Sequence, residues 1–432
     1  MRSVKVVYLK DLLKLIFLIF SLIFINNCEE EVANEPSIPN APDDCIDCGC
    51  TDYSAVNYDP IATTDDGSCQ YYNGELNLVW SKEIEEAGEM WSMRPVSDGG
   101  FILACGGAGE CEGGTFQNPC EFYGQLVRLD ANGEVIWHRI YEESSAIYHA
   151  RETLDGGFIA AGYYECVNSM DCYPDMYIMK TDSDGNLEWS VLEASGNNNN
   201  DWARDAIETQ DGNFVVTGTW NDDGWNSKAS LRKYGTNGEL LWAKNYNNST
   251  ANEAYELIET DEGDLVFAGY SGTQHGFYKW YMVKTDADGN QIWKKANNST
   301  GDAILYGLCK SPDGSYAAAG FCNSWRSNLV LKRNQNNGNN LWNWNGCMIG
   351  EQNIAGVYDI TAAAGGGYYF LDERNYLTRV DEDGQIVFVE NVQHNLAVIE
   401  LDNGDVVVGG RGAFLDGGYG GSANIMRLSF SN

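Results

Sequence analysis

The chain has 432 residues, with 63 acidic side chains against 27 basic ones and a formal net charge of −36. A phosphate backbone repels so acidic a chain, which excludes nucleic acid as a partner. Aromatic residues and glycine are plentiful and proline is scarce, which favours short strands joined by glycine turns over a disordered chain.

Residues 1–27 are predicted to be a signal peptide. Basic side chains come first, and an uninterrupted apolar run follows at residues 15–25. A helix of that length covers about 16 Å, whereas a bilayer core is about 30 Å thick. An export signal is therefore favoured over a lasting membrane span.

The apolar run ends at Ile25-Asn-Asn-Cys28, which is followed by Glu29-Glu-Glu31. This segment resembles a bacterial lipobox, which implies that Cys28 carries the lipid and begins the mature chain. The acidic cluster resembles the signal that sends some lipoproteins of Gram-negative bacteria to the cell surface. We expect a location at the bacterial outer membrane, held by the lipid anchor only and surface-exposed, with a periplasmic-facing orientation as the alternative. Residues 28–44 are acidic, contain proline and read as a tether.

Residues 45–71 are predicted to be a small acidic module bounded by cysteines. The stretch from Cys50 to Cys69 follows the pattern C-T-D-x-x-A-x-N-Y-x-P-x-A-x-x-D-D-G-S-C. It resembles a short repeat of secreted and surface proteins and is loosely similar to the calcium-binding thrombospondin type 3 repeats. Carboxylates of the kind that calcium takes are present at Asp52, Asp59, Asp65 and Asp66. The alternative is that these side chains cap turns in a knot held by one disulfide. No other cofactor is expected.

Twelve cysteines remain once Cys28 is set apart, and several form close pairs. An even number in close pairs favours an oxidising compartment. The predicted disulfide partners are Cys50 and Cys69, Cys111 and Cys120, and Cys166 and Cys172. Metal binding is the alternative, but Cys45-x-x-Cys48 lacks the second pair that a tetrahedral site needs.

Residues 72–432 repeat one pattern seven times. The fullest copy reads T-L-D-G-G-F-I-A-A-G at 153–162 and Y-I-M-K-T-D-S-D-G-N-L-E-W at 177–189. A period near 50 residues indicates a repeat architecture. The closing aromatic residue recurs at Trp80, Trp137, Trp189, Trp242, Trp293, Trp342 and Phe388.

Each copy contains four short apolar runs rich in β-branched and aromatic residues. In the fourth copy these are residues 254–260, 264–269, 281–285 and 290–295, separated by Gly, Asp or Asn. Such runs are typical of strands. Four antiparallel strands in seven copies predict an all-β fold, a seven-bladed β-propeller of four-stranded blades. The Asp-Gly clusters between the runs are complete as tight hairpins, so we expect turns there and not metal sites.

The two ends of the array complement each other. The last copy stops at 423–430, which matches a third strand, and the array begins at 75–84, which matches a fourth. We predict that the N-terminal strand completes the last blade, which removes the free sheet edges of an open array. The pattern resembles the DGG…KxDxxGxxxW repeats of secreted bacterial propellers and, more distantly, quinoprotein-type and YWTD-type propellers. With Cys28, the resemblance implies a secreted bacterial propeller lipoprotein.

Function is expected on the face that carries the long loops between the second and third strands, because the tight turns lie on the other face. Aromatic side chains in these loops suit a glycan or the hot spots of a protein ligand. The candidates are Tyr163, Tyr164, Trp220, Trp225, Tyr270, Trp280 and Trp325.

Two other functions stay open at this point. One is an enzyme acting on extracellular polysaccharide, a hydrolase or lyase that uses paired carboxylates. The other is a structural component of an envelope complex. No HExxH frame, GxSxG elbow or phosphate loop occurs in the sequence, and no catalytic residue is assigned.

Overall fold

The computed structural model describes residues 48–49, 63–69, 76–108, 122–165, 173–196, 199–221, 226–273, 276–297, 302–322, 327–345, 356–394, 396–411 and 422–430. Predictions for these residues lie outside that part of the chain: Cys28, Cys50, Asp52, Asp59, Cys111, Cys120, Cys166, Cys172, Trp225 and Trp325.

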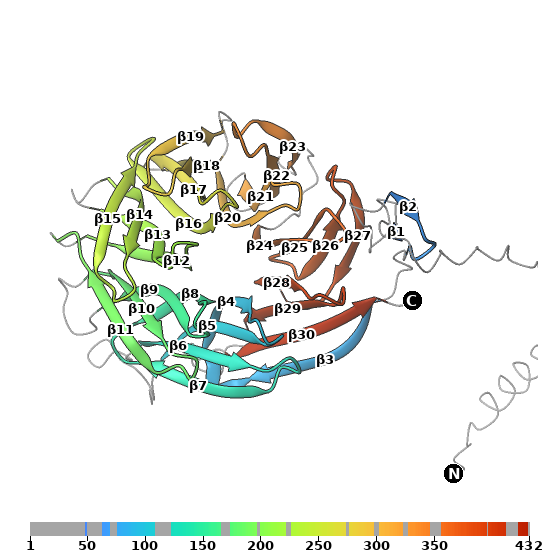
Figure 1. The fold of residues 1–432 in the computed structure, drawn as a ribbon, viewed down its shortest axis with the longest axis horizontal. Coiled ribbons are helices and arrows are strands. Elements are labelled where there is room, and N and C mark those ends of the chain that lie inside the picture. Colours follow the sequence, from blue (N-terminus) through green and yellow to red (C-terminus); the bar gives the residue numbers. More distant parts are fainter. Residues whose placement is uncertain are drawn as a thin grey trace, which may run out of the picture. The chain divides into compact units, whose positions relative to one another are not determined.

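Seven four-stranded antiparallel sheets stand around one axis, as the sequence predicts (Figure 1). The first strand of each blade is innermost and the fourth is outermost. Blade 1 holds β4 (Glu89–Pro95), β5 (Phe101–Ala108), β6 (Phe122–Leu129) and β7 (Val135–Tyr141), with the 3-10 helix η1 (Glu85–Ala87) before it. Blade 2 holds β8 (Ala146–Glu152), β9 (Phe158–Tyr164), β10 (Asp175–Thr181) and β11 (Leu187–Glu193). Blade 3 holds β12 (Trp202–Glu208), β13 (Phe214–Trp220), β14 (Lys228–Tyr234) and β15 (Leu240–Tyr246).

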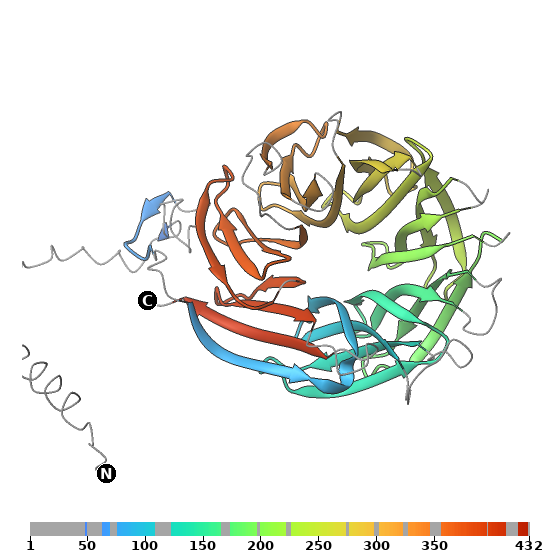
Figure 2. The ribbon, with the colours of Figure 1, turned by 180° about the vertical axis from the view of Figure 1, so that it is seen from behind.

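The remaining blades repeat this order around the ring (Figure 2). Blade 4 holds β16 (Ala251–Glu259), β17 (Leu265–Thr273), β18 (Gly276–Thr285) and β19 (Gln291–Ala296). Blade 5 holds β20 (Ala303–Lys310), β21 (Tyr316–Cys322), β22 (Ser327–Arg333) and β23 (Asn340–Asn345). Blade 6 holds β24 (Val357–Ala362), β25 (Tyr368–Asp372), β26 (Tyr376–Val380) and β27 (Ile386–Asn391). Blade 7 holds β28 (Ala397–Glu400), β29 (Val406–Arg411), β30 (Ala423–Phe430) and β3 (Leu76–Ile84).

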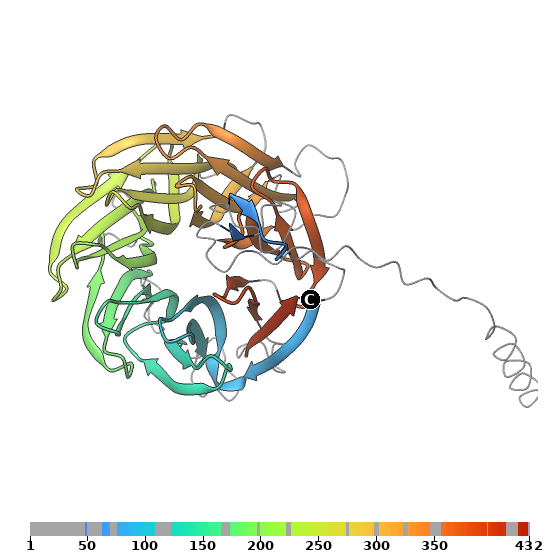
Figure 3. The ribbon, with the colours of Figure 1, turned by 45° about the vertical axis from the view of Figure 1, so that its right-hand side comes forward.

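Blade 7 is closed by the first strand of the propeller. β3 pairs antiparallel with β30 from Leu76 opposite Phe430 to Ile84 opposite Ala423, and the two strands lie side by side where the ring closes (Figure 3). The predicted closure is confirmed. Apart from the propeller, β1 (Cys48–Gly49) and β2 (Thr64–Asp65) form a short parallel pair. None of the helices described is long and apolar enough to cross a membrane.

In six of the seven copies, the repeated acid and cation form a pair within one blade. The Asp155 carboxylate accepts the Gly157 backbone N–H at 2.9 Å in the turn between β8 and β9. Lys180 of β10 reaches across the sheet to the same carboxylate at 2.9 Å. Asp211 and Lys233 of the next blade repeat the arrangement at 2.6 Å. The acids of these turns therefore fix hairpins, as the sequence predicts.

The repeated tryptophan joins neighbouring blades. Trp137 of blade 1 donates its indole N–H to the Ser183 carbonyl of blade 2 at 3.1 Å, and its ring lies against Gly185 in the same turn. Trp189 repeats the contact with the Thr236 carbonyl of blade 3 at 2.9 Å. The apolar cores accordingly lie between blades, for example where Leu126 of one blade packs near Phe158 of the next.

The last glycine of the D-G-G-F-x-x-x-G pattern shapes the innermost strand. A Cβ on Gly162 of β9 would lie 2.0 Å from the Ala146 carbonyl oxygen of β8. That close approach accompanies a β-bulge, because the register of β8 on β9 shifts between Ile147 and His149. A bulge inserts one unpaired residue and redirects its side chain. Tyr148 is that residue here.

Candidate functional site

The innermost strands of six blades carry a bulge at the same place. In each, one residue is skipped by the pairing with the second strand, and that residue lines a cavity on the propeller axis. We call these residues the axial ring: Trp91, Tyr148, Arg204, Tyr255, Tyr306 and Tyr358. β28 has no bulge, and blade 7 contributes Leu396, Ala397 and Arg411 instead.

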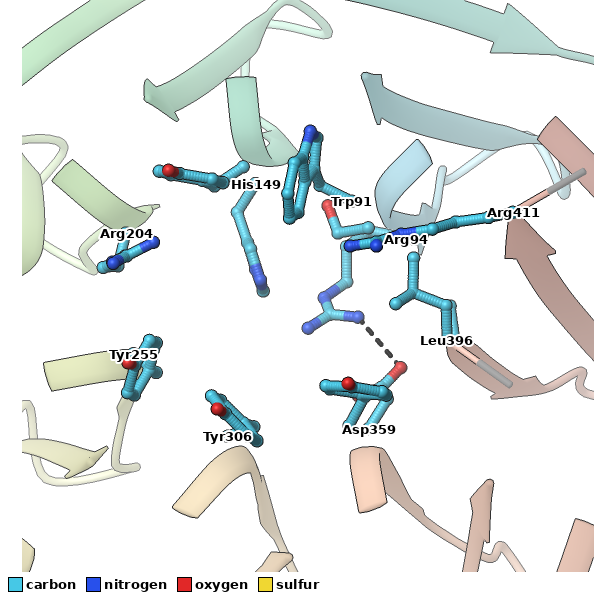
Figure 4. Close-up of a pocket in the computed structure, with 13 residues that line it drawn as sticks. Trp91, Arg94, His149, Arg204, Tyr255, Tyr306, Asp359, Leu396 and Arg411 are labelled. Atoms are coloured by element: carbon cyan, nitrogen blue, oxygen red, sulfur yellow. Dashed lines mark hydrogen bonds and ion pairs between the residues drawn. The ribbon is translucent and has the colours of Figure 1, made fainter. Parts of the chain in front are cut away.

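The axial ring surrounds a cavity of about 390 Å³ (Figure 4). Ring residues lie near the start of the innermost strands, so the cavity is nearer the face of the long loops than the face of the tight turns. Cavities of this size are typical of sites for small molecules. A cavity therefore lies toward the face on which the sequence predicts function, and the prediction itself stays untested by the fold.

Ring contacts hold the lining side chains in place. Tyr148 meets Trp91 edge to face at a centroid distance of 5.2 Å, and Tyr255 meets Tyr306 at 4.8 Å. The Arg204 guanidinium lies 4.6 Å from the Tyr148 ring centroid and 5.1 Å from that of Tyr255. Aromatic and cation–π contacts of this kind each contribute about 0.5–2 kcal/mol. The lining side chains are thus held in place by contacts with one another.

Next to the axial ring, toward the face of the tight turns, charged side chains of different blades pair near the propeller axis. Arg94 of blade 1 reaches Glu256 of blade 4 at 2.5 Å and Asp359 of blade 6 at 3.2 Å. Arg151 of blade 2 binds Asp205 of blade 3 through two contacts of 2.8 and 3.1 Å. We call these residues, together with His149, the axial ion network. Figure 4 shows Arg94 meeting Asp359 at the edge of the cavity.

The acids of the axial ion network also bind the backbone of the following blade. Asp205 accepts the Leu257 N–H at 3.1 Å, Glu256 accepts the Leu308 N–H at 2.7 Å, and Asp359 accepts the Val398 N–H at 3.1 Å. One inward acid thereby fixes the position of the neighbouring innermost strand. Removing one member would leave a buried charge unpaired, which typically costs about 3–5 kcal/mol.

Burial raises the pKa of the acids Asp205 and Glu256, and pairing with cations lowers it. Burial acts to raise the pKa of Asp205, but Arg151 and His149 outweigh it and hold the pKa well below the usual range. Burial raises the pKa of Glu256, and Arg94 offsets only part of that effect. At the rim, burial raises the pKa of Tyr358 to about 12, with its hydroxyl donating to Glu373 at 2.9 Å. That phenol is therefore neutral at physiological pH.

A metal ion does not fit the one cluster of potential ligands found among the described residues. Ligand atoms of His149, Asp205 and Glu256 lie within 4.8 Å of one another. Both carboxylates already bind Arg151, and Glu256 also binds Arg94. A divalent cation there would face two guanidinium groups at contact distance, which is unfavourable by simple Coulomb repulsion.

The five loop-face aromatics that are both expected from the sequence and described by the structure lie outside the cavity lining. Tyr163 stacks behind Tyr148 at 5.5 Å, and the nearly buried Tyr270 packs against Tyr255 and Tyr278. Trp220 lies under the Arg232 guanidinium at 3.7 Å, and Trp280 packs on the core between blades 4 and 5. Tyr164, at the end of β9, is partly exposed. Their role in binding stays a prediction.

In the acidic module, Asp65 is exposed, Asp66 is partly exposed, and both bind nearby backbone. Asp65 accepts the Gly67 N–H at 2.9 Å, and Asp66 accepts the Ser68 N–H at 2.8 Å. Hydrogen bonds from Ser68 lower the pKa of Asp66. Cys69 of the module is in a disulfide bond, as is Cys322 at the end of β21 in blade 5. Calcium binding and the pairing of Cys69 with Cys50 stay predictions.

The sequence does carry a signal for the axial ring, at a position inside the repeat and not in the variable loops. When the copies are aligned, five of them have an aromatic residue at the bulge position of the first strand, and the third copy has Arg204 there. The aromatic residues are Trp91, Tyr148, Tyr255, Tyr306 and Tyr358. Because these residues repeat from copy to copy, their pattern indicates scaffold as much as function.

No family model and no curated protein matches the sequence. Solved structures do match in fold. The RRP9 WD40 repeats match with a TM-score of 0.55 at 8% identity, over 82% of this chain and 100% of that one. The WD40 propeller domain of Doa1 matches with a TM-score of 0.53 at 12% identity, over 84% and 99%. A quinohemoprotein alcohol dehydrogenase from Pseudomonas putida HK5 matches with a TM-score of 0.49 at 11% identity, over 88% of this chain and 79% of that one. At such low identity the likeness to the two WD40 structures shows the fold alone. The protein is a seven-bladed β-propeller.

Proposed function

We propose that this protein is a binding protein that takes a glycan into the axial cavity of its long-loop face without transforming it. The observation that carries the proposal is the axial ring, five aromatic side chains and one arginine around a cavity. Aromatic rings offer flat apolar faces for the C–H surfaces of a sugar, and the arginines offer donors for its oxygens.

The carboxylates support binding over catalysis. Asp359 is the one carboxylate that lines the cavity among the described residues. Its two oxygens accept the Ile360 N–H, the Val398 N–H and the Arg94 guanidinium. A glycosidase needs a pair of carboxyl groups free to transfer protons or attack. No observation on the described residues favours a second function.

The test is a glycan array probed with the mature chain, followed by titration of the best ligand against two variants. Trp91→Leu removes one wall of the cavity while keeping an apolar side chain, and we expect affinity to fall at least about tenfold, or about 1.4 kcal/mol. Tyr376→Leu is the matched control, since Tyr376 is exposed and lies outside the cavity lining. Equal affinity of Trp91→Leu and wild type would contradict a cavity site. The absence of any bound glycan, with a protein ligand found instead, would overturn the proposal.

The proposal includes the location expected from the N-terminal sequence. A lipid on Cys28 and the acidic tether of residues 29–44 would hold the propeller at the outer face of the outer membrane. Protease treatment of intact cells is the test. Digestion only after the outer membrane is broken would favour the periplasmic-facing alternative.

A further inference from the structure

Cationic side chains line the axial cavity, whereas most of the acids that pair with them do not line it. Three arginines line the cavity, Arg94, Arg204 and Arg411, against the single acid Asp359. In the whole chain acids outnumber cations by 63 to 27, so the lining reverses the balance of the molecule. The acids that hold the two outer arginines, Glu253 and Glu89, do not line the cavity.

Arg204 is the residue most clearly built into the site. It is the one member of the axial ring that is not aromatic, and its guanidinium is held between the rings of Tyr148, Trp202 and Tyr255. Its only ion-pair partner in the described residues is Glu253, at 3.3 Å. Its Nε is buried and has no hydrogen-bond partner among the described groups. A stacked guanidinium that pairs with one acid through one of its nitrogens keeps its other donors for a ligand.

The hydrogen-bonding groups of the cavity also favour a ligand that brings acceptors. The oxygens of Asp359 already accept three donors, so the lining carboxylate has little to offer a ligand donor. Arg411 lies 4.5 Å from the Trp91 ring centroid, pairs with Glu89 at 2.7 Å and is more than one-third exposed. The Ser92 hydroxyl is buried and has no partner among the described groups. A ligand that satisfies this lining must bring acceptors, and preferably a negative charge.

We infer that the ligand is an acidic sugar, a residue that carries a carboxylate on its ring as uronates do. Its carboxylate pairs with Arg204, and its ring lies among the aromatic side chains of the axial ring. Arginine binds a carboxylate through two parallel N–H bonds, which adds specificity to charge. This inference rests on the proposed function, because it names the class of glycan for the same cavity.

The experiment is calorimetric titration of the full mature chain with an oligogalacturonate and with the same oligomer after reduction of its carboxyl groups. Wild type should bind the acidic oligomer at least about tenfold more tightly than the neutral one. Arg204→Met should remove that preference while leaving the affinity for the neutral oligomer within about twofold. Arg204→Lys keeps the charge without the planar fork and should fall between the two.

Arg232→Met is the matched control. Arg232 is on the same blade, stacks on Trp220 at 3.7 Å and pairs with one acid, Glu193, at 3.2 Å, but it does not line the cavity. We expect it to keep the preference of wild type, and thermal unfolding of each variant separates loss of binding from loss of folding.

Three results would overturn the inference. Equal affinity for the acidic and neutral oligomers would contradict the acidic class and leave the proposed glycan function standing. Equal affinity for the oligogalacturonate and for hexaglutamate would show that charge alone is recognised and not a sugar. Binding of neither oligomer, with no other glycan bound on the array, would remove the proposed function and the inference together.

Discussion

Gly185 shows how strongly a single repeated residue is constrained. Its φ is +77°, in the left-handed region that side chains with a Cβ rarely adopt. A Cβ there would also lie 2.9 Å from the Trp137 ring of the neighbouring blade. Gly156 has a similar φ of +80°, but nothing lies within 4 Å of its Cβ position. The backbone conformation therefore restricts both positions to glycine, whereas packing against the neighbouring blade restricts only Gly185.

We predict that Gly156→Ala costs about 1–2 kcal/mol, the price of a left-handed residue with a Cβ. Gly185→Ala should cost about 1–3 kcal/mol more, because the Trp137 ring must move. Urea unfolding followed by tryptophan fluorescence measures both. If the two variants have the same free energy of unfolding, the packing of Trp137 on the next blade does not stabilise the propeller.

At the scale of the element, an ion pair ties the hairpin between the first two strands to the third strand in six of the seven blades. Burial acts to raise the pKa of Asp155, but the Thr153 hydroxyl, Lys180 and the Gly157 N–H outweigh it and lower the pKa to about 2, from an ordinary value of 3.8. A lowered pKa in the folded state means that the carboxylate stabilises the fold above the unfolded value. That stabilisation is lost as the pH falls from about 4 to about 2.

We predict that Asp155→Asn lowers the midpoint of thermal unfolding at pH 7, and that the gap from wild type narrows as the pH falls below about 4. Scanning calorimetry across this pH range measures the gap. Asp184→Asn is the control, because it removes the same charge from an exposed position on the other turn of the same blade. A gap that stays constant down to pH 2 would contradict the pairing of Asp155 with Lys180.

At the scale of the whole molecule, the ring depends on contacts between distant parts of the chain. β3 and β30 join residues more than 300 positions apart, and Arg94 reaches Glu256 across 162 positions. An open ring would leave the backbone groups of β30 unpaired at a sheet edge, which is a template for association with other chains.

We predict that a chain starting after Ile84, which lacks β3, unfolds at a lower temperature and self-associates. A chain starting at Tyr71 keeps β3 and is the control. Calorimetry and light scattering measure the two effects. A monomeric protein with an unchanged midpoint would show that β3 is not needed to close the ring.

Much of the fold follows from the sequence alone. Seven copies of four short runs, tight Asp-Gly turns and complementary ends specify the number of blades and the closing strand, because turn chemistry and strand pattern are local properties. The same reasoning separates the face of the long loops from the face of the tight turns, since antiparallel strands place alternate loops on opposite faces.

Only the tertiary structure decided which residues meet at the axis. Tyr148 and its equivalents face the cavity because a bulge, permitted by Gly162 and its equivalents, redirects them, and a bulge is a property of paired strands. The pairing of Arg94 with Glu256 depends on the ring being closed, so no local pattern predicts it. The sequence therefore determined the scaffold and the face, and the closed ring determined the cavity and its charges.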